Sequence, residues 1–355
     1  MKIQTIAKYV DQPVLLNKLQ QKMPALLIGT GAAYGTYDTF KSPRRHSHEH
    51  PDKHKYQNTE SRLKQGVKNA IIISSTITAS LVGARGLKLN GKKIINGLME
   101  NTPLDKLLQK QSEAVDHFIS NKKPEDSALL QILNKARTTH LSCDDIETLS
   151  AKLPLDADRE SLFKVILPDK ENLDSKEIFG EIKRLSLLGA IPVAGGIAGG
   201  IAADTVTHTA SKKKTADKIK EGFYQYFANI FLCNVGAGAA LFTAEQLAKA
   251  KIIKPLKPAH KLCTILAGIT ATGIVGGSFI ANYLSKKLIN PLFGQKTDQK
   301  LYDERKPELT DIALHADDIA TAGVLSGFKW IEPALPLMYF VSGYRAGIGY
   351  RNVNN

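Results

Sequence analysis

The chain has 355 residues, a formal net charge of +14 and a mean hydropathy of −0.17. Its length allows roughly two or three domains, and its three widely spaced cysteines exclude a disulfide-stapled scaffold. Aromatic and basic residues do not alternate in the manner that stacks bases, so no nucleic-acid partner is expected. Short lysine clusters lie beside apolar segments instead, which indicates contact with anionic lipid headgroups.

Residues 1–22 contain short apolar pieces interrupted by charged residues and a proline. They lack the apolar run and small-residue cleavage site of a secretory leader, and they predict an amphipathic N-terminal segment. Residues 23–85 are expected to form a first helical hairpin. Its two apolar segments, 23–37 and 69–84, are of borderline length for a membrane helix and flank a His-rich loop.

The His-rich loop reads RRHSHEHPDKH at residues 44–54. Imidazoles and carboxylates at this density are able to bind Zn²⁺ or Ni²⁺. Neighbouring arginines and lysines oppose a bound cation, and the alternating spacing differs from that of a structural metal site. A solvated polar loop is therefore favoured and no cofactor is expected, while the metal alternative rests on His46, His48, His50 and His54.

Residues 86–184 differ in composition from their surroundings. Leucine and isoleucine recur at helical spacing between charges that nearly balance. Helix starts are indicated by TPLD, by PEDSALL and by SCDDIETL, in which Ser142 precedes an acidic first turn. We expect a soluble helical insert here.

A second helical hairpin is expected at 185–248, and a degenerate third hairpin with a C-terminal apolar segment at 262–349. A helix needs about 20 apolar residues to cross a bilayer core. Three stretches free of Asp, Glu, Lys and Arg approach or exceed that length, namely 185–203, 222–244 and 262–285. Shorter apolar runs lie at 319–328 and 333–344. The predicted fold class is all-α: a polytopic membrane protein of glycine-rich helical hairpins, with about five to seven membrane helices.

The first and second hairpins resemble each other in sequence, which indicates an internal repeat. The shared motifs are an Asp-Thr pair at 38–39 and 204–205, a K-x-G at 64–66 and 220–222, and a KII at 93–95 and 251–253. Because the last two motifs lie outside the glycine- and alanine-rich segments, biased composition alone does not account for the match.

Glycines recur four residues apart along the apolar segments, which places each pair on one helix face. A glycine inside a water-exposed helix costs about 0.8–1 kcal/mol relative to alanine. In lipid, helices associate through close backbone approach, which small residues permit. We therefore expect helix-packing faces within a membrane, and faces suited to a homo-oligomer. The glycines concerned are Gly31, Gly35, Gly195, Gly196, Gly199, Gly200, Gly273 and Gly277.

Polar residues recur near the ends of the apolar segments, at a fixed interval after a glycine. Ionisable groups at one depth in several helices line ion paths in transporters. Asp204 and His208 also have the i, i+4 spacing of a helix face, which suits a proton relay. The favoured interpretation is that these residues mark helix ends. The ion-path alternative rests on Asp38, Asp204, His208, Glu245 and Asn282.

The sequence carries none of the phosphate-loop, nucleophile-elbow, zinc-protease or dinucleotide signatures, so no enzymatic activity is expected. We expect an integral membrane protein of structural or membrane-organising type, whose basic loops contact anionic lipid. A small-solute or cation transporter is the alternative, and a soluble helical scaffold is the second alternative. The denser basic flanks place the N-terminus and the insert in the cytoplasm.

Overall fold

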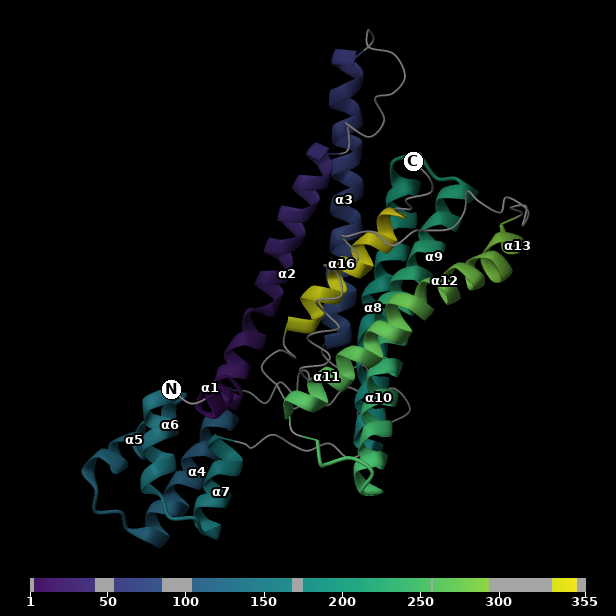
Figure 1. The fold of residues 1–355 in the computed structure, drawn as a ribbon. Helices are drawn as coiled ribbons and strands as arrows, with labels where there is room; N and C mark the ends of the chain where they lie inside the picture. The colour runs from purple at the N-terminus through teal and green to yellow at the C-terminus, as the bar shows by residue number, and fades with distance from the viewer. Residues whose placement is uncertain are drawn as a thin grey trace.

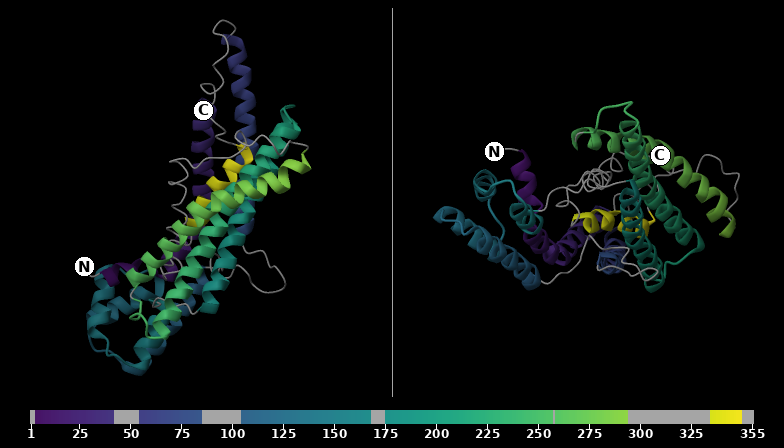
Figure 2. Two further views of the ribbon diagram at one scale, coloured as in Figure 1. Left: turned by 45° about the vertical axis from the view of Figure 1, so that its right-hand side comes forward. Right: turned by 90° about the horizontal axis from the view of Figure 1, so that it is seen from below.

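The computed structural model describes residues 3–41, 54–84, 104–167, 175–256, 258–293 and 334–349. Most of these residues are helical, with no strand among them, which confirms the predicted all-α class (Figure 1). They form a long bundle with a small four-helix unit at one end (Figure 2).

The four-helix unit consists of α4 (Leu104–Lys122), α5 (Ser127–Thr138), α6 (Cys143–Lys152) and α7 (Ala157–Ile166). It has its own apolar core, in which Phe118, Leu133 and Leu162 are buried. The predicted start of α6 is observed, because the Ser142 hydroxyl accepts a hydrogen bond from the Asp145 amide at 3.2 Å. The Asp145 carboxylate in turn accepts one from the Ser142 amide at 2.8 Å, which completes a capping box.

The N-terminal helix α1 (Ile3–Val10) packs on this unit (Figure 1). Just after α1, the buried Gln12 amide donates to the Leu141 carbonyl at 2.8 Å and accepts from the Leu141 amide at 2.6 Å. The Lys8 ammonium lies 5.2 Å from the centroid of the Phe163 ring, within the range of a cation–π contact. The amphipathic N-terminal segment therefore has a protein partner, which sequence reasoning did not provide.

Residues 104–167, expressed alone, are expected to fold and to melt cooperatively when followed by circular dichroism, because they contain a core of their own. Ser142→Ala removes one side of the capping box and should lower the free energy of unfolding by about 1 kcal/mol. For a fragment of this size, that corresponds to a fall of about 4–8 °C in Tm. A broad, non-cooperative melt would contradict the assignment of an independent unit.

Acid should destabilise the same fragment. The pKa of Asp126 is held below its usual value by the Lys152 ammonium, and that of Asp156 by the Lys122 ammonium. Because these pKa values are lower in the folded state, the stabilisation is present above about pH 4 and is lost as the pH falls through the folded values. Thermal melts between neutral and acidic pH measure this effect, and a Tm independent of pH would contradict it.

The bundle contains the remaining described helices, which lie between residues 13 and 349. They are α2 (Pro13–Lys41), α3 (His54–Ala84), α8 (Ser175–Val206), α9 (Lys212–Tyr226), η3 (Phe227–Phe231), α10 (Leu232–Lys249), α11 (Pro258–Ile269), η4 (Thr270–Gly277), α12 (Ser278–Leu284), η5 (Ser285–Ile289), α13 (Asn290–Leu292) and α16 (Leu335–Ile348). The three η segments are π-helical. Helix α8 contacts α3, α16, α9 and α10, and it is the centre of the bundle (Figure 1).

Two described helices are long and apolar enough to cross a membrane: Ile182–Val206, and the continuous run Lys212–Lys249 through α9, η3 and α10. The predicted five to seven are not confirmed. Helices α2 and α3 each carry several polar and charged residues over one half of their length. The apolar stretch 262–285 is divided among α11, η4 and α12, and 333–344 falls largely within the 14-residue α16. The run 319–328 lies outside the described residues.

The first hairpin consists of α2 and α3, and the second of α8 and the run through α9, η3 and α10. In each hairpin the first helix leads away from the four-helix unit and the second returns. Helices α2 and α8 end at the far end of the bundle, and α10 ends near the four-helix unit (Figure 1). Helix α16 contacts α2, α3, α8 and α9, and so touches both hairpins.

Candidate functional site

A group of charged residues surrounds Asp204, in the last turn of α8. This side chain is buried, with the residue 5% exposed. Lys218 of α9 donates to one carboxylate oxygen at 2.5 Å, and Lys68 of α3 donates to the other at 2.9 Å. The Thr209 hydroxyl adds a third hydrogen bond at 3.1 Å. One carboxylate therefore ties together three helices.

Glycines make room for this cluster. A Cβ atom at Gly200 would lie 2.7 Å from Cε of Lys218, and one at Gly349 would lie 2.9 Å from its Cγ. Gly349 ends α16 in the left-handed conformation with φ 68°, which glycine adopts without strain. The lysine stem therefore passes between α8 and α16 and carries its charge to the C-terminal ends of both helices, where backbone carbonyls favour a cation.

A polar cavity of about 270 Å³ opens beside the cluster. Its charged lining consists of Lys68, Lys214 and Lys218 with Asp204 and Asp217. The cavity lies at the end of the bundle where α8 ends and α9 begins. The structure thus places Asp204 inward but near a helix end rather than halfway along the helix.

Two glycine pairs on α8 face different helices: Gly196 and Gly200 face α16, and Gly195 and Gly199 face α3. A Cβ at Gly196 would overlap the carbonyl oxygen of Gly343, and a Cβ at Gly347 would lie 2.6 Å from the carbonyl oxygen of Gly196. One residue earlier, Gly195 faces α3, where the Ser75 hydroxyl donates to its carbonyl at 2.7 Å. A Cβ at Gly199 would lie 2.6 Å from Cβ of Ser75. Close backbone approach on both faces leaves no room for larger residues.

The other predicted packing glycines also meet neighbouring helices. Cβ atoms at Gly31 and Gly35 of α2 would meet the Ile73 side chain of α3. In the third segment, Gly273 faces Cys233, and a Cβ at Gly277 would lie 2.6 Å from Cα of Ala228. Sequence reasoning missed a further pair, because a Cβ at Gly236 of α10 would lie 2.5 Å from the carbonyl oxygen of Gly268 in α11.

A buried polar ladder follows the cluster along α9 and η3. Asn229 donates to Gln225 at 2.9 Å, and Gln225 donates to Glu221 at 2.8 Å. All three residues are buried, and their spacing of four keeps them on one helix face. Both amides donate toward Glu221, the arrangement that suits an ionised carboxylate. The ladder was not predicted, because its residues lie within or beside an apolar stretch and match no motif.

The remaining ion-path residues are not brought together. Asp38 accepts a hydrogen bond from the Tyr344 hydroxyl at 3.2 Å, near the same end of the bundle as Asp204. Glu245 lies near the opposite end, where it pairs with Lys261 at 3.1 Å. Asn282 is half-buried in α12.

The prediction that Asp204 and His208 share a helix face is wrong. Helix α8 ends at Val206, and His208 is an exposed residue with φ 55° in the turn that follows. The Thr209 amide instead returns to the Asp204 carbonyl at 2.8 Å, which closes the helix end.

Of the predicted metal-binding histidines, His46, His48 and His50 lie outside the described residues, and His54 is the first residue of α3. Within the ranges that the structure describes, no three His, Cys, Asp or Glu side chains are grouped to hold a metal ion.

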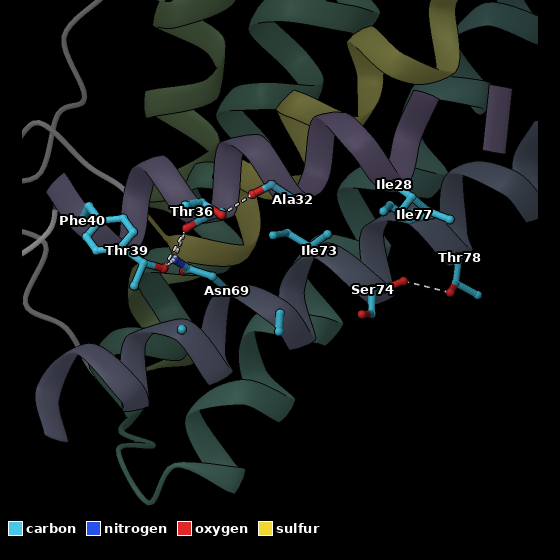
Figure 3. Close-up of a pocket in the computed structure, with 13 residues that line it drawn as sticks. Ile28, Ala32, Thr36, Thr39, Phe40, Asn69, Ile73, Ser74, Ile77 and Thr78 are labelled. Carbon is cyan, nitrogen blue, oxygen red and sulfur yellow. Dashed lines mark hydrogen bonds between the residues drawn. The ribbon is translucent and has the colours of Figure 1, made fainter. Parts of the chain in front are cut away.

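An apolar groove with a volume of about 620 Å³ lies between α2 and α3 (Figure 3). Ile28, Phe40 and Ile73 line it together with smaller residues. At one end Asn69 points across to α2 and donates to Thr39 at 2.9 Å and to the Gly35 carbonyl at 3.2 Å. These hydrogen bonds join the two helices at that end of the groove.

No family model, curated protein or solved structure matches this chain. A carboxylate that accepts hydrogen bonds from two ammonium groups has its charge compensated, which leaves little capacity to bind a further cation or accept a proton. Its evident effect is to hold α3 and α9 against the C-terminal end of α8.

Asp204→Ala is expected to leave the buried Lys218 ammonium without its carboxylate and to cost about 3–5 kcal/mol of stability. The loss would appear as a lower temperature of unfolding for the full chain in detergent. Glu160→Ala is the control, because it breaks an exposed pair with Lys164 that is worth about 0–1 kcal/mol. Equal unfolding temperatures for the two variants would contradict a stabilising role of the cluster.

Proposed function

We propose that the protein is a multi-pass integral membrane protein of structural or membrane-organising type. The bundle would lie in the bilayer, while the four-helix unit and α1 would lie in water. The observation that carries this proposal is the distribution of exposed large apolar side chains. Among the described residues of the four-helix unit, Leu155 alone is an exposed large apolar residue. The described bundle helices expose many such residues, including Leu26, Ile28, Phe40, Val82, Phe279, Tyr283, Leu288 and Leu292.

The outer face of α8 supports the same reading. Ala194, Ala198 and Ala202 are exposed there at a spacing of four, within one of the two helices long enough to span. Polar groups of the span-length helices are turned inward, as with Gln225 and Asn229. Apolar side chains outside and polar groups within are the pattern expected of a helix bundle in lipid.

The geometry favours an organising role over transport. A transporter needs exchangeable polar sites at mid-depth, whereas Asp204 is compensated and lies near a helix end. The ladder from Glu221 to Asn229 is the feature that favours a conduction path as second candidate. Its side chains hydrogen-bond to one another, and we assign them to fixing how α9 packs.

Basic residues lie at both ends of the bundle, including Lys212 and Lys213 at one end and Lys249 and Lys254 at the other. We propose that they contact anionic lipid headgroups. The proposed orientation places the N-terminus and the four-helix unit in the cytoplasm. The apolar groove between α2 and α3 would then be filled by lipid acyl chains.

Membrane fractionation tests the proposal. The full chain should remain in the membrane pellet through a carbonate wash and be released only by detergent. The fragment 104–167, prepared in the same way, is the matched control and should be soluble. Release of the full chain by carbonate would contradict the proposal and would favour a soluble scaffold instead.

A further inference from the structure

The turn between α10 and α11 presents isoleucines to the outside in a fixed conformation. Lys251 has φ 60°, and the Ile252 amide donates to the Leu247 carbonyl at 3.0 Å. This bond back into the helix is the outer one of a Schellman motif. In that motif the apolar residue after the left-handed one commonly packs onto the helix. Here Ile252 is 69% exposed, and Ile253 is exposed beside it.

The base of the turn is fixed on both sides. Glu245 of α10 pairs with Lys261 of α11 at 3.1 Å, and both side chains are largely buried. Further along the same two helices, Gly236 and Gly268 bring the backbones into close approach. The isoleucine pair is therefore part of a turn whose two flanking helices are fixed to each other, and both side chains remain exposed.

Lysines surround this apolar tip. Lys249, Lys251 and Lys254 are exposed, and the sequence from residue 246 to residue 257 contains no Asp or Glu. An exposed apolar pair flanked in the chain by exposed lysines is complementary to an anionic bilayer surface, where headgroup phosphates contact the lysines and acyl chains contact the apolar side chains. An acidic protein surface would match the lysines but would leave the isoleucines without a partner.

We propose that the turn formed by residues 249–254 is a binding site for anionic phospholipids, with lysines on the headgroups and the isoleucine pair at the boundary of the acyl chains. This inference rests on the proposed membrane function and adds to it a specific site, in which an exposed isoleucine pair lies beside the lysines. The KII motif of the second hairpin, residues 251–253, lies within this site. The first copy of the motif, at residues 93–95, lies outside the described residues.

The test uses the full chain with an environment-sensitive dye on Ile253→Cys, in a background with Cys143→Ser and Cys263→Ser. The buried Cys233 is kept. The protein is reconstituted into vesicles of phosphatidylcholine alone or mixed with phosphatidylglycerol, some carrying a quencher near the headgroup. A dye on Leu155→Cys is the matched control, since that residue is exposed in the four-helix unit.

Quenching at residue 253 should be stronger in anionic vesicles than in zwitterionic ones, and absent at residue 155. Lys251→Gln with Lys254→Gln should reduce the anionic signal to the zwitterionic level, whereas Lys212→Gln with Lys213→Gln at the other end should not. Vesicle flotation reports membrane association separately. Three outcomes with protein that floats with the vesicles would overturn this inference and leave the proposed membrane function intact. They are no quenching at residue 253, equal quenching in both lipids, and quenching that the Lys251 and Lys254 changes leave unaffected. If residue 253 is quenched as expected but a carbonate wash removes the protein from the membrane, the inference is supported and integral insertion is contradicted.

Discussion

Gly196→Leu is expected to prevent α16 from packing against α8 and to abolish the folded bundle. Even a methyl group at this position would overlap the carbonyl oxygen of Gly343. The obstacle is backbone, which has no alternative rotamer, so the two helices must move apart. We expect a loss beyond about 4 kcal/mol, the range reached only by severe packing defects. Size-exclusion chromatography of the full chain in detergent should show aggregation in place of a single symmetric peak.

Gly180→Leu is the matched control, because it lies in the same helix and a Cβ there would meet nothing within 4 Å. Gly196→Ala should give an intermediate result, with a lowered temperature of unfolding. A symmetric peak for Gly196→Leu, equal to that of Gly180→Leu, would contradict the close crossing of α8 and α16.

Ala194→Lys is expected to prevent stable insertion of α8. Ala194 is exposed near the middle of Ile182–Val206, so a lysine there would clash with nothing. In water the change would be nearly neutral, because alanine and lysine both favour helices. At the centre of a membrane helix a lysine costs about 2.5–3.5 kcal/mol. The fraction of protein that resists carbonate extraction should therefore fall strongly.

Ala151→Lys provides the comparison, since Ala151 is exposed on α6 of the four-helix unit. It should leave carbonate resistance unchanged. Equal behaviour of the two variants would indicate that the outer face of α8 contacts water, and the membrane proposal would fail.

The glycine spacing predicts helix faces from sequence, but it does not predict their partners. Gly195 and Gly196 are neighbours in sequence, and a rotation of about 100° per residue turns them toward different helices. Which helices these are depends on segments far away in the chain, α3 for Gly195 and α16 for Gly196. A pattern within one helix contains no information about such distant contacts.

The charged cluster illustrates the same limit. Asp204 was recognised as a polar residue at the end of an apolar run, but its partners Lys68 and Lys218 belong to other helices. Nothing in the local sequence distinguishes these lysines from the exposed ones nearby. His208 was misplaced because its i, i+4 spacing was taken as helical, whereas the helix ends two residues before it.

The position of α16 in the chain constrains the order in which the protein is assembled. Its glycines seat against Gly196, more than a hundred residues upstream, so this contact can form only after most of the polypeptide has been made. Contacts this distant in sequence form slowly, and earlier segments fold first during synthesis. Until then the glycine face of α8 that contacts α16 stays open to chaperones, proteases and other nascent helices. Truncation before Leu335 should therefore yield a short-lived protein in the cell, even though every other described helix would be present.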